Sequence, residues 1–374
     1  MARPQLCISG DSHVVETGEI FNGLPERFGD AAPRMVYVEG TGDILQIGDT
    51  RRFPVGRFGV AGHYANDPET QEMIKMGYKG LRPGILDPME RIKDQDIDGL
   101  DAEVLLPSIM FGVYGISDPE IVAATFKNFN DWILNYANGA PPKRLFASAC
   151  IPLHDIDKAI EELRRVKNMG HVAANIPCVP PADRPYSDRS YDKFWAVAEE
   201  LELPLVMHVL TTAQPNMGLP THWGPVMGYA LWQTAMAYVM GDIIVGGVCA
   251  RFPNLKFVPT EWETGWVAHY LQRLDWAAYR VPRDQIPAEL TESPSFYFHR
   301  QFTMTFEDDR QGLATRYDIG VKNLMWGSDF PHHDSTFPKS QAILDDIFED
   351  IPDEERFAMT VSNCVDLYGL PIEY

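Results

Sequence analysis

The sequence predicts an α/β fold, a (β/α)8 TIM barrel with a small β insertion near the N-terminus and helical decorations. Eight short apolar runs of four to six residues have the length of buried strands. Segments with helical periodicity lie between most of these runs, and this alternation indicates parallel β/α units. The chain has 374 residues, which exceeds the usual length of such a barrel by about 120.

The elements follow one another in a regular order. The predicted strands are residues 5–9, 102–106, 145–150, 172–176, 205–208, 257–260, 302–306 and 323–326. The clearest helix is 156–169, where Ile156, Ile160, Leu163 and Val166 share one face and Asp155 precedes as a cap. Segments 119–138, 191–201 and 338–348 have a similar pattern.

The extra residues have definite places. Residues 35–58 contain two alternating strands and turn residues, which predicts a small β excursion at about 35–60. An apolar helix rich in Tyr, Trp and Met is expected at 228–240. We find no repeat, linker or low-complexity segment, so we expect a single domain over residues 1–374.

Composition excludes several classes of protein. The net charge is −21, and a nucleic-acid binder would need a basic stripe that the sequence lacks. No apolar run approaches 18 residues, so no membrane span is expected. The five cysteines are widely spaced without a CxxC pair, which indicates buried free thiols. There is no nucleotide-binding glycine motif. We expect a cytoplasmic protein.

Metal-type ligands stand at the ends of four predicted strands. Asp11 and His13 follow the first strand and, two residues apart, point the same way in extended chain. His208 ends the fifth strand, Glu261 follows the sixth, and Asp329 follows the eighth. Taken singly, each has an ordinary alternative: a capped turn, a histidine bonded to backbone, or a helix cap. Together they predict a site for zinc, manganese or iron at one mouth of the barrel.

The chain resembles the amidohydrolase superfamily, in the branch that includes aminocarboxymuconate-semialdehyde decarboxylase and resorcylate-type decarboxylases. The resemblance covers nearly the whole chain and rests on five motifs. They are DSHVVE (11–16), DGLDAEVLLPS (98–108), YDKFWAVAEELELPLVMH (191–208), CARFPNLKFVPTE (249–261) and MWGSDFPHHDSTFP (325–338). The resemblance implies that Asp11, His13, His208 and Asp329 bind the metal.

Two departures from the family pattern bear on the reaction. The first ligand, usually Glu or His in these decarboxylases, is the shorter Asp11, and the histidine usual after the sixth strand is Glu261. Glu261 is expected to be a general base or a further ligand, and Asp329 a ligand or base. The leading hypothesis is a metal-dependent hydrolase or decarboxylase-like lyase. It would act on a small carboxylate-bearing or aromatic compound through a metal-activated water.

The ligand count suggests an alternative. With His332, the set contains three carboxylates and three imidazoles, more than one open zinc site needs. Two metals about 3.5–4 Å apart would fit such a set. Some members of this branch are dinuclear non-haem iron monooxygenases, and in others the histidine at position 332 supports the site without ligating. A third hypothesis is a non-catalytic subunit that stabilises an active paralogue.

The pocket walls and partners are the last expectations. His222, Trp223 and Trp232 are predicted to bind substrate as an aromatic roof over the metal, with ordinary helix packing as the alternative. The expected partners are a small-molecule substrate and a second copy of the chain in a homodimer, with no nucleic acid or membrane.

Overall fold

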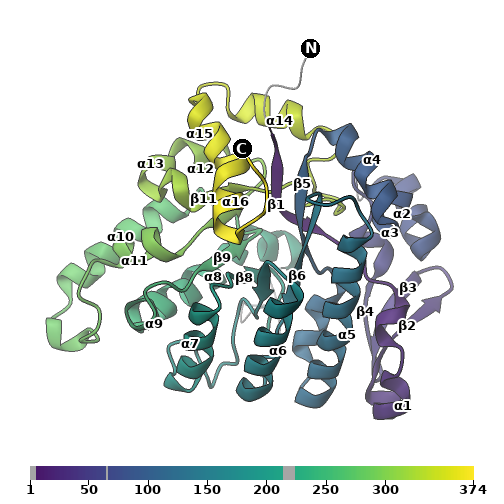
Figure 1. Ribbon diagram of the computed structural model, residues 1–374, viewed down its shortest axis with the longest axis horizontal. Helices are drawn as coiled ribbons and strands as arrows, with labels where there is room; N and C mark the ends of the chain where they lie inside the picture. Colours follow the sequence, from purple (N-terminus) through teal and green to yellow (C-terminus); the bar gives the residue numbers. More distant parts are fainter. Residues whose placement is uncertain (1–5, 65, 214–223) are drawn as a thin grey trace.

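The computed structural model describes residues 6–64, 66–213 and 224–374, and its centre is a set of short parallel strands (Figure 1). Six form one curled parallel sheet in the order β1-β5-β6-β7-β8-β9, and two more, β10 and β11, form a second parallel sheet. The strands are β1 (Ile8–His13), β5 (Ala102–Leu106), β6 (Leu145–Cys150), β7 (Ala173–Asn175), β8 (Leu205–His208), β9 (Phe257–Thr260), β10 (Met304–Phe306) and β11 (Leu324–Trp326). Every predicted run overlaps one of these strands.

The predicted barrel is confirmed as an α/β fold with a curled parallel sheet, but the recorded ladders do not form one closed ring of eight strands. An isolated parallel bridge joins Phe257 in β9 to Phe302 just before β10. Across the other seam, Ser12 Oγ lies 3.1 Å from Ser328 Oγ, and the Asp329 amide donates to the carbonyl of Asp11 at 2.9 Å. Isolated bonds, in place of a continuous ladder, therefore connect β11 to β1.

The first strand corrects one boundary. The predicted strand was 5–9, whereas β1 begins at Ile8 and continues through His13. Its polar residues are fully buried, and the register shifts between Ser9 and Ser12. Asp11 and His13 therefore lie inside the strand. The strand continues beyond its apolar residues because the polar side chains that follow find partners within the fold. The Ser12 hydroxyl, for example, donates to Ser9 Oγ at 2.9 Å.

Helices surround the strands and cover their outer faces (Figure 1). In α6, Asp155 caps the first turn by accepting from two amides, and Gly170, in the left-handed conformation, follows the last residue. The longer helices between β1 and β8 in the chain are α4 (Pro88–Asp98), α5 (Pro119–Asn138), α6 (Ile156–Met169) and α7 (Asp192–Glu200). The later helices are α8 (Gly224–Val245), α9 (Val248–Arg251), α10 (Val267–Arg280), α11 (Pro294–Gln301), α12 (Arg310–Ala314), α13 (Arg316–Ile319), α14 (Ser340–Ile347), α15 (Asp353–Phe357) and α16 (Asn363–Tyr368).

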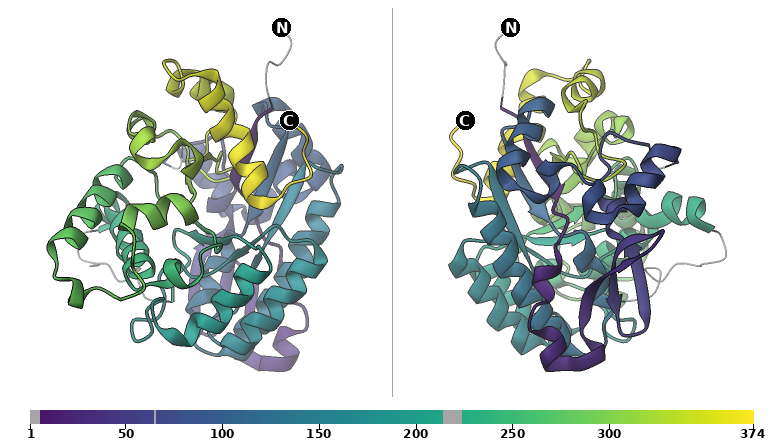
Figure 2. Two further views of the ribbon diagram at one scale, coloured as in Figure 1. Left: turned by 60° about the vertical axis from the view of Figure 1, so that its left-hand side comes forward. Right: turned by 90° about the vertical axis from the view of Figure 1, so that its right-hand side faces the viewer.

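The predicted β excursion is confirmed, with three strands where two were expected. An antiparallel sheet of β2 (Pro33–Val38), β3 (Gly42–Ile47) and β4 (Thr50–Pro54) stands beside the central strands, preceded by α1 (Leu24–Phe28) (Figure 2). The short helices α2 (Pro68–Lys75) and α3 (Pro83–Leu86) lead from it to α4.

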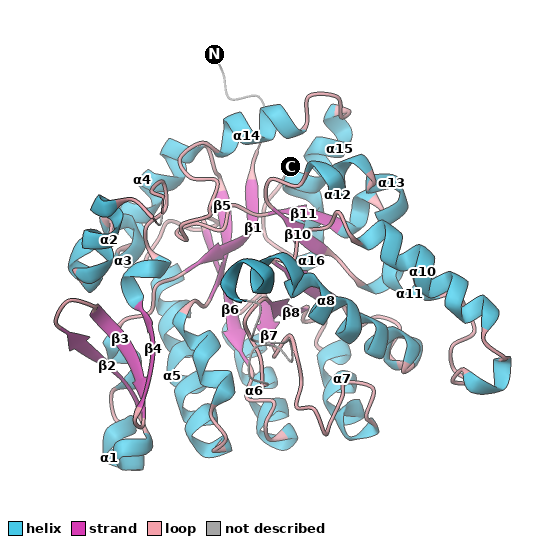
Figure 3. Ribbon diagram, turned by 180° about the vertical axis from the view of Figure 1, so that it is seen from behind, coloured by secondary structure: helices cyan, strands magenta, loops and turns pink. Residues whose placement is uncertain are grey.

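Helix α8 is longer than the predicted 228–240 and crosses in front of β6 and β8 in Figure 3. It is apolar on all sides, and it leaves Val226 and Tyr238 about four-fifths exposed, at 80% and 77%. Among the described residues, no helix is long and apolar enough to span a membrane. All five cysteines are buried and free, as predicted.

Candidate metal centre

The carboxyl ends of β1 and β8 bring the first three candidate ligands together. His13 Nε2 lies 3.3 Å from Asp11 Oδ1 and 3.1 Å from His208 Nε2, and His208 Nε2 lies 3.9 Å from Asp11 Oδ1. All three side chains are at most 1% exposed. The prediction that Asp11 and His13 point the same way is confirmed by these contacts.

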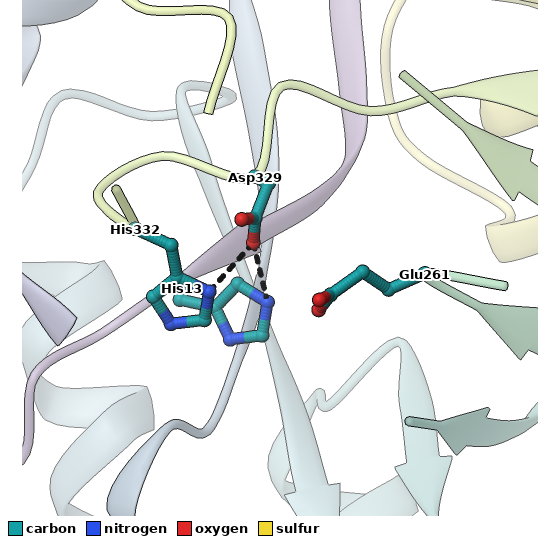
Figure 4. A group of neighbouring side chains, drawn as sticks. All are labelled: His13, Glu261, Asp329 and His332. Carbon is teal, nitrogen blue, oxygen red and sulfur yellow. Dashed lines mark ion pairs between the residues drawn. The ribbon is translucent and has the colours of Figure 1, made fainter. Parts of the chain in front are cut away.

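A second group shares His13 and joins Glu261, Asp329 and His332 to it (Figure 4). Asp329 Oδ1 lies 3.2 Å from His13 Nε2 and 2.8 Å from His332 Nδ1. Glu261 approaches from the side opposite His332, and its Oε2 lies 2.9 Å from His208 Nε2. In each of the two groups, one potential ligand atom per residue falls within 4.8 Å of the others.

Two of these carboxylates stand on unusual backbone. Glu261 follows β9 with φ of 62° and Asp329 follows β11 with φ of 54°, a region that non-glycine residues adopt rarely and often at functional sites. The helix-cap alternative for Glu261 is wrong, because the next α-helix, α10, begins only at Val267. Instead the Glu261 amide donates to Thr305 Oγ1 at 2.9 Å, which fixes the turn after the strand.

Backbone carbonyls decide the orientation of two imidazoles. His13 Nδ1 lies 2.7 Å from the carbonyl oxygen of Pro107, and His208 Nδ1 lies 2.8 Å from that of Val209. Because a carbonyl only accepts, each Nδ1 carries the hydrogen and each neutral ring keeps its lone pair on Nε2. Those two Nε2 atoms face each other, an arrangement that a cation between them would stabilise.

The carboxylates also lack partners. Asp11 Oδ1 and both oxygens of Asp329 are buried, yet no described residue donates a hydrogen bond to them. Burying a carboxylate without donors costs several kcal/mol, about 3–5 when a partner has been removed. Inward-facing imidazole lone pairs and undonated carboxylates are what a divalent cation requires. The residues present therefore fit a metal.

The charge states agree with this reading of the site. Burial raises the pKa of Asp329 and of Glu261 well above their ordinary values. Asp334 and Asp11 raise both further, and Asp329 also raises that of Glu261. Burial, reinforced by His13, lowers the pKa of His208 to about 3 and also lowers that of His332 well below its ordinary value. Neutral imidazoles are the form that ligates metal, and a bound cation would favour the ionised carboxylates.

The structure adds Glu307, which the sequence analysis did not single out, and gives the contacts of Tyr229 and Asp334 at the edge of the site. Glu307 follows β10, and burial raises its pKa well above the ordinary value, with Asp329 and Asp334 contributing. The Tyr229 hydroxyl donates to Asp334 Oδ2 at 2.6 Å, and the Tyr229 ring packs on Trp232. The signal for Glu307 was available, because it directly follows a predicted strand as Glu261 does.

Of the three predicted substrate-binding residues, the structure describes Trp232. Trp232 lies on α8 and packs partly against the core as well as on Tyr229, so its role toward substrate stays a prediction. His222 and Trp223 lie outside the described residues.

A second buried charged group lies between β5 and α4, next to the candidate ligands. Arg91 donates to both carboxylate oxygens of Glu103, at 2.7 and 3.1 Å, and Gln95 donates to Glu103 at 2.6 Å. Arg91 also donates to the backbone carbonyls of His13 at 2.6 Å and Phe330 at 3.4 Å. We call Arg91, Gln95 and Glu103 the arginine cluster, and Asp11, His13, His208, Glu261, Asp329 and His332 the strand-end cluster.

A family model for amidohydrolases matches residues 63–370 of this chain. The chain belongs to the amidohydrolase family. The predicted resemblance to the amidohydrolases is thereby confirmed. Asp11 and His13 precede the matched region, so their assignment rests on their contacts with His208 and Asp329.

Curated relatives of this amidohydrolase are lyases. It is 24% identical over 270 residues to a γ-resorcylate decarboxylase of Rhizobium sp., covering 68% of this chain and 80% of the relative. It is 23% identical over 338 residues to a 2-keto-4-carboxy-3-hexenedioate hydratase of Sphingobium sp., covering 81% and 93%.

Solved structures share the fold. An amidohydrolase from Mycobacterium avium subsp. paratuberculosis matches with a TM-score of 0.79 at 22% identity, covering 98% of this chain and 100% of the other. A dihydroxybenzoic acid decarboxylase from Polaromonas sp., with bound manganese and the inhibitor 2-nitroresorcinol, matches with a TM-score of 0.67 at 19% identity, covering 99% and 98%.

Proposed function

We propose that this amidohydrolase is a metal-dependent lyase that acts on a small aromatic or unsaturated carboxylate, with decarboxylation as the leading reaction. The observation that carries the proposal is the strand-end cluster, in which Asp11 Oδ1 and both oxygens of Asp329 lack donors and imidazole lone pairs face inward. Relatives that release carbon dioxide or add water to carboxylated substrates favour a lyase over a hydrolase.

The residues divide into holders and a proton carrier. Asp11, His13, His208 and Asp329 would hold the metal, and zinc, manganese and iron all suit this mixture of ligands. When bound, the metal supplies Lewis acidity toward a substrate oxygen and lowers the pKa of a coordinated water. Glu261 is the residue that we assign to proton transfer, because it is the one carboxylate of the cluster with appreciable exposure, 15% of its side chain.

Decarboxylation sets a clear demand on that proton carrier. The carbon–carbon bond to the carboxylate breaks, carbon dioxide leaves, and a proton takes its place on the carbon. Glu261 Oε2 is 2.9 Å from His208 and beside the open side of the cluster, a position from which it can deliver that proton. For a hydratase-like reaction the same group would take a proton from water.

The test is direct. Protein purified without added metal or chelator is analysed for metal content, then supplied with Mn²⁺, Zn²⁺ or Fe²⁺ and incubated with 2,6-dihydroxybenzoate and 5-carboxyvanillate. We expect about one metal per chain. We also expect the substrate to lose its carboxylate, which is measured by carbon dioxide release and by the change in ultraviolet absorbance. Turnover that persists unchanged in Asp329→Asn would contradict the proposal.

A dinuclear non-haem iron monooxygenase is the second candidate, and one observation favours it. The possible ligands form two groups that share His13, one with Asp11 and His208 and one with Glu261, Asp329 and His332. This candidate expects about two metals per chain with substantial iron, and oxygen uptake in an oxygen electrode. Activity with a single zinc or manganese in the absence of oxygen would exclude it.

The remaining expectations are proposals of the same kind. The sheet of six strands and the sheet of two, joined by bonds at both seams, support a closed (β/α)8 barrel as the scaffold. We also propose a homodimer, because α8 exposes the apolar side chains of Val226 and Tyr238 on one helix. Sedimentation velocity would show about twice the mass of one chain, and a monomer at micromolar concentration would refute the dimer.

A further inference from the structure

One short segment touches all three imidazoles of the strand-end cluster. It is residues 107–111, which follow β5 and enter a 3-10 helix (Ile109–Gly115). The carbonyl of Pro107 accepts from His13 at 2.7 Å, and Ser108 Oγ lies 2.9 Å from His332 Nε2. The Phe111 ring stacks on His208 with centroids 4.5 Å apart and meets His13 edge-on at 5.9 Å.

A buried carboxylate fixes the middle of this segment. Glu16 is fully buried, and its two oxygens accept from the consecutive backbone amides of Ser108 at 2.9 Å, Ile109 at 2.8 Å and Met110 at 3.1 Å. Charge-assisted hydrogen bonds of this kind are stronger than neutral ones and offset part of the cost of burying the carboxylate. Glu16 contacts none of the candidate ligands through these bonds, and the contacts that link its carboxylate to the imidazoles run through residues 107–111.

The Ser108 hydroxyl connects this segment to His332. Ser108 Oγ has one hydrogen and two neighbours, the carbonyl of Val14 at 2.8 Å and His332 Nε2 at 2.9 Å. The carbonyl only accepts, so both contacts are hydrogen bonds when Ser108 donates to Val14 and His332 donates from Nε2. The neutral ring then keeps its lone pair on Nδ1, the atom 2.8 Å from Asp329 Oδ1. In this arrangement all three imidazoles present lone pairs to the same space.

We infer that Glu16 is a positioning residue for the metal-binding imidazoles, acting through residues 107–111. Glu16 holds this segment in place through the three backbone amides. The segment sets the ring orientation of His13 and determines which nitrogen of His332 carries the hydrogen. It also places the Phe111 ring against His208. The inference rests on the proposed metal-dependent function and deepens it by naming what holds the ligands in place. Partners that orient metal-bound histidines typically change metal affinity by about 10–100-fold when they are removed.

The test measures Mn²⁺ binding by calorimetry on metal-free, full-length protein, at a temperature where circular dichroism shows each variant folded. Glu16→Gln keeps the size of the side chain but turns an amide NH₂ toward backbone amides that need an acceptor. We expect the Mn²⁺ dissociation constant to rise by about 10–100-fold. Glu19→Gln is the matched control, because Glu19 is exposed and bonds Thr17 and Trp132 instead. Its dissociation constant should stay within twofold of that of the wild type.

A purely structural role for Glu16 would lower the melting temperature while leaving metal affinity unchanged in the folded protein, and that result overturns the inference. If Glu16→Gln does not fold, Ser108→Ala decides, since it removes only the hydroxyl between Val14 and His332. A tenfold weaker affinity in Ser108→Ala supports the inference, and an unchanged affinity refutes it. Wild-type protein that binds Mn²⁺ but has no lyase activity refutes the proposed reaction alone, whereas wild-type protein that binds no divalent metal refutes both.

Discussion

Two buried clusters of charge lie side by side in this protein, and they are satisfied in opposite ways. In the arginine cluster, one cation faces one anion, and Glu103 receives hydrogen bonds from both Arg91 and Gln95. In the strand-end cluster, three carboxylates face three imidazoles, and Asp11 and Asp329 keep oxygens that no described residue supplies with a donor. Arg91 and Asp329 are equally buried, since both side chains are 0% exposed.

The difference separates a structural group from a functional one. A buried ion pair with all its hydrogen bonds costs little in the folded state, and Arg91 uses its remaining donors to fix the carbonyls of His13 and Phe330. Carboxylates left without donors are tolerated where a ligand completes them. The arginine cluster thus fixes the backbone at His13 and Phe330, which carries the strand-end cluster.

The largest expected effect breaks the incomplete cluster. Asp329→Asn should reduce kcat/KM by about 10³-fold or more, roughly 4 kcal/mol, because a metal ligand and an essential negative charge are lost. The same variant in metal-free form should be at least as stable as the wild type, since a neutral amide relieves repulsion among buried carboxylates. Urea unfolding and the lyase assay check the two halves, and Asp157→Asn, which changes an exposed carboxylate on α6, is the matched control.

Breaking the arginine cluster should instead lower the free energy of unfolding. Arg91→Met leaves Glu103 buried without its cation and should lower the free energy of unfolding by about 3–5 kcal/mol. Adding Glu103→Leu should recover most of that loss, because a buried pair replaced as a whole costs little. A single variant that loses less than about 1 kcal/mol in urea unfolding would show that the arginine cluster does not stabilise the fold.

Metal addition should distinguish the clusters without destroying either. Mn²⁺ at about 100 times its dissociation constant should raise the free energy of unfolding of the wild type by about 2.7 kcal/mol. Gln95→Met should keep this increment, because it leaves the bonds from Arg91 to the His13 and Phe330 carbonyls in place, whereas Asp329→Asn should lose it. Thermal unfolding with and without a chelator measures both. An equal response in the two variants would place the metal elsewhere.

A buried histidine outside both clusters shows how far burial alone acts. His171 is 2% exposed, and burial, aided by Arg165, lowers its pKa to about 4. In the unfolded chain His171 therefore binds a proton near pH 6.5, whereas in the folded chain it binds one only near pH 4. The free energy of unfolding falls as the pH drops from 6.5 toward 4. Between pH 6.5 and 5 the loss should be about 1–2 kcal/mol. His171→Gln should remove that part of the pH dependence in urea titrations, and an unchanged slope would contradict it.

Most of the strand-end cluster was predictable from sequence, because strand positions and polar strand ends are both local signals. The eight predicted runs each overlap a strand, and Asp11, His13, His208, Glu261, Asp329 and His332 were all singled out before their contacts were known. The family resemblance added the assignment of ligands, and the structure then brought all six into contact.

Contacts between distant elements were not predictable in the same way. The pairing of Arg91 with Glu103 and the capture of three backbone amides by Glu16 depend on packing that no periodicity records. The boundary of β1 was wrong because apolar letters end before the strand does. The third strand of the β excursion was missed because its residues lack clear alternation, and nothing described bears on His222 and Trp223.

The two strands that meet at this seam, β1 and β11, are synthesised far apart in time. Ser12 and Ser328 touch, yet 316 residues of chain separate them. At about 5–20 residues per second, a ribosome takes roughly 16–60 s to pass from one to the other. During that interval Asp11 and His13 exist without Asp329 and His332, so the set of six residues is complete only after His332 has been made. Metal that reaches the chain before then meets an incomplete set of ligands.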